Sequence, residues 1–337
     1  MISISEIAKM ANVSKMTVSN VINKKYDKVS QETIERIEKI IKETGYTPSL
    51  FARSLKSNHS RIVMLAIPQT IDNDPYKNKA FNNPFYGEII NSIEYNLREK
   101  GYFLMFRFID NKEVLQNLVV NWNIDGVIIL GAVKKEMDTI FKGIKVPAVY
   151  LDTYVEDDKN DYINTDDVNG GFLATDYLIK QGRKKVGIVV SPMDQVGVAS
   201  KRFDGYKKAL EHNNLQLDQS RIFEGNPSLD FGNRLGKDIK ENIHNFDALF
   251  VYSDIMALST INGLKNQGIN IPEEIAIVGF DGLYIGELSE PKLTTVKQDI
   301  TTKGEKAVEL LLRKINKESL TPEKWTIGVK LEKRQSA

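Results

Sequence analysis

The 337-residue chain contains no cysteine, and it has only three histidines and two tryptophans. The absence of cysteine excludes disulfides, thiol nucleophiles and cysteine metal sites, and it fits a reducing compartment. His59, His212 and His244 lack the spacing of metal ligands and have no evident carboxylate and nucleophile beside them. We therefore expect no metal site and no histidine-based catalysis.

Other absences narrow the class further. No G-x-G-x-x-G or Walker loop follows the first strand-like run "IVMLAI", so a phosphate cradle for nucleotide chemistry is missing. The N-terminus lacks the basic, apolar, small-residue order of a signal peptide, and no run approaches the roughly 18 apolar residues of a membrane helix. These absences predict a protein without a cofactor or a membrane partner that is not an enzyme and is located in the cytoplasm.

What the chain does have is an uneven charge distribution. Its net charge is +1, but residues 1–61 hold eleven Lys or Arg against six acids, about +5, and the remainder carries about −4. A basic head on a mildly acidic body suggests a polyanionic partner for the head alone. From charge alone, a solvated basic surface explains the pattern equally well.

The first 46 residues show three short helical patterns and no strand pattern. The segment "SISE" at Ser3 is a capping box, Ser14 and Ser30 are placed to cap two further helices, and Gly45 is placed to end the third. The segment "ISEIAKMANVSKMTVSNVIN" therefore reads as helix, tight turn, helix. Such a pair places its second helix in a DNA major groove. A helical subdomain used only for packing is the alternative.

From Arg61 onward, apolar strand-like runs alternate with amphipathic helices. The runs are "IVMLAI", "YFLMFRF", "DGVIIL", "PAVYL", "KVGIVV", "ALFVY" and "IAIVGF". Continuous apolar strands joined by helices indicate parallel sheets covered on both faces. About 275 residues of this pattern exceed one comfortable sheet, so we predict an α/β body of two doubly wound parallel-sheet lobes behind a small all-α helix-turn-helix head.

Three of the apolar runs end in a carboxylate, at Asp152, Asp254 and Asp281. Ligands of open parallel sheets bind beyond the carboxyl ends of the strands, so these acids are placed to accept hydrogen bonds from a polyhydroxylated ligand. Arg202, in "SKRFDGY", would donate to its oxygens. For each acid, a helix-cap or turn role remains the alternative, above all for Asp254 beside Ser253.

The whole pattern resembles the lactose/galactose repressor (LacI/GalR) family of bacterial transcription factors. The likeness begins at "SISEIAKMANVSKMTVSNVIN" and "VSQETIERIEKIIKETGYTPSLFARSLKS". It continues through "NPFYGEIINSIEYNLREKGY", "VPAVYLD", "RFDGYKKAL", "DALFVYSDIMALSTINGLKNQGINIPEEIAIVGFDG" and "LTTVKQD". This order of motifs over more than 300 residues implies the family's periplasmic-binding-protein-like body, a homodimer and a pseudo-palindromic operator.

The resemblance also implies which residues touch DNA. Base-reading positions fall on Lys15, Met16 and Asn20, where the family most often has Arg at the last. An amide suits adenine as a guanidinium suits guanine, so we expect an unusual half-site at that base pair. The segment "PSLFARSLKS" resembles the hinge helix, with Leu55 as a minor-groove wedge, although an ordinary linker helix is the alternative. The full set implied is Ser14, Lys15, Met16, Thr17, Ser19, Asn20, Asn23, Ala52, Arg53, Leu55 and Lys56.

Effector positions carry over in the same way. The set implied is Phe85, Tyr86, Asp152, Arg202, Ser253, Asp254 and Asp281. The family often has Asn where this chain has Ser253, a second acid where it has Gly282, and an aromatic where it has Pro227. The ligand is therefore expected to differ from those of well-known members. A sugar is the main expectation, a purine or nucleoside the alternative, and a non-regulatory sugar-binding protein the more distant one.

The predicted domains are a DNA-binding head, a hinge and two lobes. The head covers residues 1–46 and the hinge 47–60, the first lobe 61–163 with about 294–318, and the second 164–293 with about 319–337. The predicted protein is a cytoplasmic bacterial transcriptional regulator, expected to be a repressor, that associates with the nucleoid when bound to DNA. Its operator affinity would be controlled by a small molecule held between the lobes.

Overall fold

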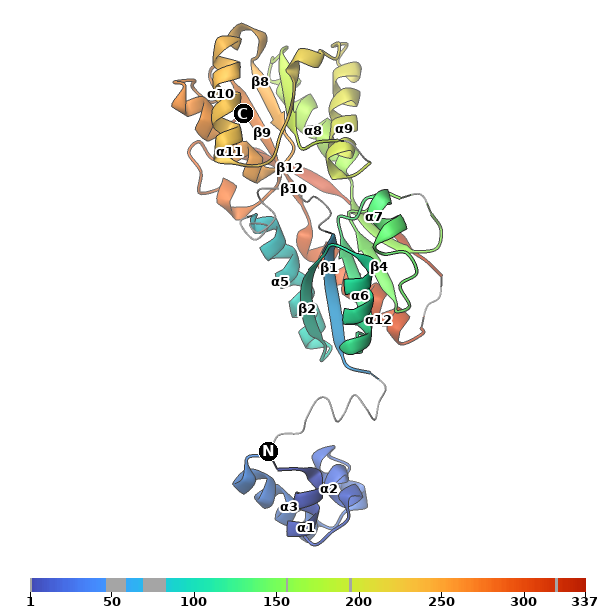
Figure 1. The fold of residues 1–337 in the computed structure, drawn as a ribbon. Helices are drawn as coiled ribbons and strands as arrows, with labels where there is room; N and C mark the ends of the chain where they lie inside the picture. The colour runs from blue at the N-terminus through green and yellow to red at the C-terminus, as the bar shows by residue number, and fades with distance from the viewer. Residues whose placement is uncertain (1, 47–58, 69–82, 156, 194–195, 319–320) are drawn as a thin grey trace. The chain divides into compact units, whose positions relative to one another are not determined.

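The computed structural model describes residues 2–46, 59–68, 83–155, 157–193, 196–318 and 321–337. The chain forms two compact units, Met1–Ser60 and Arg61–Ala337 (Figure 1). Among the described residues, no helix combines the length and apolar character that crossing a lipid bilayer would require.

The first unit is built from three short α-helices. They are α1 (Ile4–Met10), α2 (Lys15–Ile22) and α3 (Gln31–Thr44), with a 3-10 turn η1 (Tyr26–Lys28) before α3. The capping box is present, since the Glu6 amide donates to Ser3 Oγ at 3.3 Å and the Ser3 amide donates to Glu6 Oε2 at 2.8 Å. Ser14 caps α2, and Gly45 ends α3 in the left-handed region. These local predictions are confirmed.

Two details of this unit refine the predictions. Ser30 occupies the N-cap position of α3 but does not cap it through its side chain, because its hydroxyl donates instead to Thr33 Oγ1 at 2.9 Å. Asn12, in the turn between α1 and α2, has φ +52, a left-handed conformation that Asn tolerates better than most residues. The apolar faces of the three helices meet in one small core of Ile7, Ala8, Ala11, Val18, Val21, Ile34, Ile37 and Ile40.

The second unit contains two six-stranded sheets within its described residues. The first sheet has the order β11-β5-β4-β3-β1-β2 and the second β12-β10-β9-β8-β6-β7. All the pairings are parallel except that of β12 with β10. The first sheet comprises β1 (Ile62–Pro68), β2 (Phe103–Ile109), β3 (Gly126–Leu130), β4 (Ala148–Leu151), β5 (Asp161–Thr165) and β11 (Lys324–Ile327). The second comprises β6 (Val186–Val190), β7 (Ile222–Glu224), β8 (Ala248–Val251), β9 (Ala276–Asp281), β10 (Thr294–Gln298) and β12 (Val329–Glu332).

Helices cover both faces of each sheet, which explains the continuous apolar strands. The first lobe carries α5 (Pro84–Glu99), α6 (Lys112–Asn121), α7 (Lys134–Thr139) and α12 (Ile300–Ile315). The second carries α8 (Asp167–Lys180), α9 (Val198–His212), α10 (Leu229–Glu241) and α11 (Asp254–Asn266), with 3-10 turns η3 (Gln219–Arg221), η4 (Ile243–Asn245) and η5 (Tyr284–Gly286). One face of each sheet packs on α5 with α12, or on α8 with α9. The fold class predicted from the sequence is confirmed.

The chain passes between the lobes three times, and two passages differ from the predicted boundaries. The first follows β5 near the predicted residue 163. The second lies at residues 298–300 instead of about 294, because β10 pairs with β9 in the second sheet. The third lies at Gly328 instead of about 318, because β11 pairs with β5 and only β12 returns to the second sheet. β11 and β12 are four residues each, and their alternating polar and apolar residues fit the edge of either sheet, so the sequence did not show where the chain changes sheet.

Close packing of α8 against α9 depends on two glycines. A Cβ on Gly171 would lie 2.1 Å from the carbonyl oxygen of Arg202, and a Cβ on Gly205 would lie 2.1 Å from that of Val168. Both contacts are to backbone, which cannot rotate away. This approach holds the N-terminal turn of α8, with Asp167, against Arg202 of α9.

We predict that Gly205→Ala forces the two helices apart and destabilises the body by about 2 kcal/mol or more. The apparent Tm in a thermal melt should fall by roughly 5 °C or more. Gly87→Ala is the matched control, since Gly87 is also helical but no atom lies within 4 Å of the added carbon. It should leave Tm unchanged or raise it slightly. Equal melts for the two variants would contradict this packing.

Candidate nucleic-acid interface and ligand cleft

The exposed face of α2 carries the predicted base-reading side chains. Val18 and Val21 are buried, whereas Lys15 is exposed, Asn20 is half-buried and Met16 is 64% exposed. Among the described residues, none forms a hydrogen bond with the side chains of Lys15 or Asn20. They are therefore available to a partner.

The other predicted residues of this helix hydrogen-bond locally. Ser14 Oγ lies 2.9 Å from Thr17 Oγ1 and accepts from the Thr17 amide at 3.1 Å. The Asn23 amide group donates to the Ser19 carbonyl at 2.6 Å and to Ser19 Oγ at 3.3 Å. These hydroxyls retain lone pairs or protons at the surface of α2, as phosphate-contacting groups require. The predicted hinge residues Ala52, Arg53, Leu55 and Lys56 lie outside the described residues.

A cleft lies between the two lobes, at the carboxyl ends of their parallel strands. It has a volume of about 220 Å³. Six of the seven predicted effector residues line it, namely Phe85, Tyr86, Asp152, Arg202, Ser253 and Asp281. The remaining lining residues are Ile67, Pro68, Asn83, Leu130, Gly131, Val198, Tyr252 and Gln298. The cleft is thus part apolar, from the first lobe, and part charged, mainly from the second.

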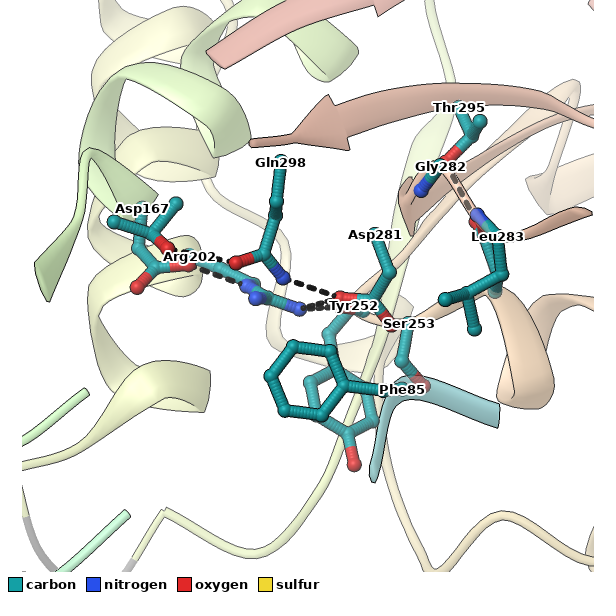
Figure 2. Close-up of polar contacts among 12 residues, drawn as sticks. Phe85, Asp167, Arg202, Tyr252, Ser253, Asp281, Gly282, Leu283, Thr295 and Gln298 are labelled. Atoms are coloured by element: carbon teal, nitrogen blue, oxygen red, sulfur yellow. Dashed lines mark hydrogen bonds and ion pairs between the residues drawn. The ribbon is translucent and has the colours of Figure 1, made fainter. Parts of the chain in front are cut away.

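Arg202 is the centre of the charged wall. Its Nε donates to Asp167 Oδ1 at 2.7 Å, and one terminal nitrogen donates to Asp281 Oδ1 at 3.2 Å and to the Tyr252 carbonyl. Its guanidinium carbon lies 3.5 Å from the centre of the Phe280 ring. Figure 2 shows Arg202 held between Asp167 and Asp281, with the ring of Phe85 beside them. The side chain is 4% exposed, so its charge is compensated almost wholly by protein groups.

Burial shifts the ionisation of this group of residues. It raises the pKa of Asp281 to about 6, although Arg202 and a hydrogen bond from Gln298 at 2.7 Å stabilise the carboxylate. Burial likewise raises the pKa of Asp167, against the opposing charge of Arg202. The pKa of Tyr154, whose hydroxyl donates to Asp167, is also raised by burial and by the charge of Asp167.

Asp152 and Asp281 both have unusual backbone conformations. Their φ angles are +47° and +124°, in the region that favours glycine. Strain of this kind costs of order 1–3 kcal/mol per residue, and it persists where the surroundings fix the residue in place. Each of the two carboxylates is fixed by a buried cation, Asp281 by Arg202 and Asp152 by Lys303.

Asp254 does not line the cleft. Its Oδ1 accepts from Thr295 Oγ1 at 2.5 Å, and its Oδ2 accepts from the Leu283 amide at 2.7 Å. Burial, and then the charge of Asp281, raises its pKa well above the usual range. The structure thus places Asp254 as a link between α11 and the loop after β9, whereas Ser253, which caps α11, reaches the cleft.

Several residues around the cleft were not predicted. Gln298 ends β10 at the same sheet edge as the predicted acids, and its position in "LTTVKQD" could have indicated it. Lys303 lies on the otherwise apolar face of α12, with Ile300, Gly304, Ala307 and Leu311, and that misfit was a second signal. Asp167 begins α8 directly after the first passage between lobes and gave no signal of its own.

Comparison with known proteins bears on both units. The family model for bacterial regulatory proteins of the lacI family matches residues 3–49, and that for the periplasmic binding protein-like domain matches residues 175–337. The chain is 30% identical over 324 residues to the HTH-type transcriptional repressor PurR of Actinobacillus pleuropneumoniae serotype 3, covering 94% of this chain and 91% of that repressor. The chain belongs to the LacI family.

Solved structures agree with this membership. The transcriptional regulator CelR in complex with cellobiose is 27% identical, with a TM-score of 0.74 over 100% of both chains. The lac repressor dimer bound to operator and the anti-inducer ONPF is 23% identical, with a TM-score of 0.85 over 99% of this chain and 98% of that one, and shows the shared fold. This LacI-family chain is a DNA-binding transcriptional repressor with an effector-binding body.

We predict that Arg202→Met destabilises the body strongly, because it leaves Asp167 and Asp281 buried without their cation. Breaking a buried pair from one side costs about 3–5 kcal/mol. Thermal melts of the variant and of a Lys201→Met control, from the half-buried neighbour on α9, would measure the loss.

The loss of stability caused by Arg202→Met, measured as the free energy of unfolding, should grow as the pH rises. Carboxyls whose pKa is higher in the folded than in the unfolded state contribute stability at low pH and lose it as pH rises. Arg202 opposes the rise in the pKa of Asp281, which nevertheless stands at about 6, so its removal lifts that pKa further. The difference in free energy of unfolding between the wild type and the variant should therefore be larger at pH 8 than at pH 5. A pH-independent deficit would show that lost packing, not unpaired charge, is the cause.

Proposed function

We propose that this repressor binds a pseudo-palindromic operator as a homodimer and responds to a small uncharged sugar held between its lobes. The observation that carries the proposal is the cleft itself, which is lined by one carboxylate from each lobe, Asp152 and Asp281, and by the aromatic ring of Phe85. The helical unit on the same chain would bind the operator, so that ligand binding in the body can control DNA binding. The dimer in the lac repressor structure supports the oligomeric state.

In this proposal α2 enters the major groove. Lys15, Met16 and Asn20 face base edges, whereas Ser14, Thr17, Ser19 and Asn23 contact phosphates. Two-fold symmetry places the second α2 on the other half-site, about one helical turn away. The hinge assignment of Ala52, Arg53, Leu55 and Lys56 remains part of the proposal.

The cleft suits a neutral polyhydroxyl ligand of about one ring. Its volume of about 220 Å³ is below the roughly 300 Å³ from which drug-sized sites begin. Among the described cleft residues and their direct partners, the cations Arg202 and Lys303 are already bonded to carboxylates, so neither is left for a phosphate. Carboxylates held in place can accept hydrogen bonds from sugar hydroxyls, and Phe85 can cover the apolar face of a ring. The cellobiose bound by CelR supports the sugar class.

A purine or nucleoside is the alternative effector. The repressor at 30% identity carries the name PurR, which favours that class. The stacking surface of Phe85 would serve a base as well as a sugar. The carboxylates favour a ligand rich in hydrogen-bond donors, and a sugar offers more of these than a base does.

We propose further that the protein acts in the cytoplasm and releases its ligand unchanged. The regulatory character of its family supports this proposal.

A thermal-shift screen tests the effector class. Monosaccharides, disaccharides, sugar phosphates and purines are compared with the purified protein at matched concentrations. A neutral sugar at a hundred times its Kd should add about 2.7 kcal/mol, a rise of roughly 5–10 °C. Its phosphate should raise Tm far less. A response to purines alone would replace the sugar assignment by the alternative.

Two asparagine variants then locate the ligand. Asp281→Asn should weaken sugar binding at least tenfold, because Asp281 lines the cleft. Asp254→Asn is the matched control, since that carboxyl faces the interior and an amide of the same shape can keep its contacts. Loss of binding in a well-folded Asp254→Asn variant would place Asp254 at the ligand after all.

The DNA proposal is tested by selecting operators from a randomised duplex library with wild-type protein and with Asn20→Arg. The wild type should prefer adenine at the base pair that residue 20 reads, and the variant guanine, by about 1–3 kcal/mol. Operator affinity should also fall steeply with salt, because phosphate contacts dominate it. An unchanged base preference would remove Asn20 from the reading positions.

A further inference from the structure

Lys303 is a fully buried lysine whose ammonium is saturated by protein acceptors. Its Nζ donates to Asp152 Oδ1 and Oδ2 at 2.7 and 2.8 Å, to Thr165 Oγ1 at 2.6 Å and to Gln298 Oε1 at 2.9 Å. Its exposed fraction is 0%. The ammonium lies 5.8 Å from the centre of the Phe85 ring, directly behind the cleft.

The residues that accept hydrogen bonds from Lys303 lie at the cleft and at the passages between the lobes. Asp152 follows β4 and lines the cleft. Thr165 ends β5 at the first passage between lobes, and Gln298 ends β10 at the second. Thr165 Oγ1 also donates to Gln298 Oε1 at 2.7 Å, which joins the two passages. One ammonium on α12 therefore connects a cleft carboxylate to two of the three segments that join the lobes.

The bonds continue from Lys303 into the second lobe. Gln298 accepts from Lys303 through Oε1 and donates through Nε2 to Asp281 Oδ1, which also accepts from Arg202. Figure 2 shows Gln298 and Arg202 meeting at the same carboxylate. Asp152 and Asp281, the two strained acids of the cleft, are thus the ends of one chain of hydrogen bonds with Lys303 and Gln298 between them.

Burying the ammonium of Lys303 costs desolvation free energy, which a residue that served only for packing would not need to bear. The neighbours of Lys303 on the inner face of α12 are apolar, and an apolar side chain there would avoid the desolvation of an ammonium. What an apolar residue could not do is orient Asp152 and hold Gln298 with its amide nitrogen toward Asp281.

We propose that Lys303 is a positioning residue of the effector site. It orients the Asp152 carboxylate for the ligand and links that carboxylate to the first two passages. Ligand binding in the cleft would therefore change the interactions of the segments that join the lobes. The part concerning the ligand rests on the proposed function, whereas the part concerning the passages does not. Lys303 itself stays behind Phe85 and does not touch the ligand.

The test compares four variants with the wild type. Lys303→Met removes the ammonium and keeps the length of the side chain. Asp152→Asn removes the charge of its partner, and the double variant Asp152→Asn with Lys303→Met leaves no unpaired charge if the single variant folds poorly. Lys306→Met is the matched control, because it removes an ammonium from the same helix at a site that is 28% exposed, where it pairs with Glu309 and lies 4.9 Å from the centre of the Trp325 ring.

The first measurement needs no ligand. Hydrogen–deuterium exchange is followed at the amides of Asp152, Thr153 and Asp166, which donate to Ile163, Asn164 and Ile327 beside the first passage. Exchange in Lys303→Met, or in the double variant, should be at least tenfold faster there and unchanged in α10 and α11. Lys306→Met should match the wild type. Unchanged exchange at these amides in a folded variant lacking Lys303 would overturn the proposal.

The second measurement uses D-ribose, D-xylose, D-glucose, D-galactose and cellobiose as probes in calorimetric titrations. Affinity for a sugar that binds the wild type should fall at least tenfold in Lys303→Met and in Asp152→Asn. The double variant should bind no more weakly than Asp152→Asn, since both changes remove one function. A purely structural lysine would lower Tm and leave the Kd unchanged, which would overturn the ligand part. If the wild type binds none of the five sugars, the sugar assignment fails, and the exchange result alone decides the role of Lys303.

Discussion

The buried ion pairs beside the cleft, one group in each lobe, are the constraint to which the rest of the body conforms. A guanidinium and an ammonium that are almost inaccessible to water are tolerable only while their carboxylates stay within hydrogen-bonding distance. Arg202 is contributed by α9, Asp167 by α8 and Asp281 by β9, so three elements of the second lobe must keep a fixed relation. Gly171 and Gly205 make that relation possible by letting two helix backbones approach without intervening side chains. The cleft is therefore lined by groups that are oriented before any ligand arrives, and such preorganisation lowers the cost of binding.

The two binding surfaces of the chain are built on opposite principles. On α2, the side chains proposed to read bases are exposed or half-buried, and those of Lys15 and Asn20 make no hydrogen bond among the described residues, so they are available to a polyanion whose charge dominates affinity. In the cleft, nearly every polar side chain is already bonded to another, so a ligand must compete for, or add to, an existing network. The first arrangement suits recognition that a single side-chain change can redirect. The second suits a response in which a small ligand alters the balance of interactions over two lobes.

Sequence reasoning succeeded where the structure is locally determined. Ser3, Ser14 and Gly45 act through neighbours three or four residues away, and the apolar strands are long enough to be recognised singly. The convergence of Asp152 and Asp281 also followed, because carboxyl ends of parallel strands gather at one edge, whereas Arg202, on α9, was placed there by the family resemblance. The sequence could not tell Asp254 from Asp281, since both follow an apolar strand and only the turn geometry decides which one faces the cleft. Nor could it show that Lys303 meets Asp152, 151 residues away, or where the last strands change sheet.

The three passages between the lobes have a consequence for the order in which the protein can fold during synthesis. The first sheet begins with β1 but is completed only by β11, and α12 covers one of its faces together with α5 (Figure 1). Until residues 300–327 leave the ribosome, the first lobe lacks an edge strand and part of its apolar cover. In the second lobe, β10 and β12 follow soon after β6 to β9, so its sheet is completed with a shorter delay after its own synthesis. The lobe that is synthesised first is thus the one that must wait longer, and its exposed apolar face in the interval is where a nascent chain of this kind is most open to chaperones and to misfolding.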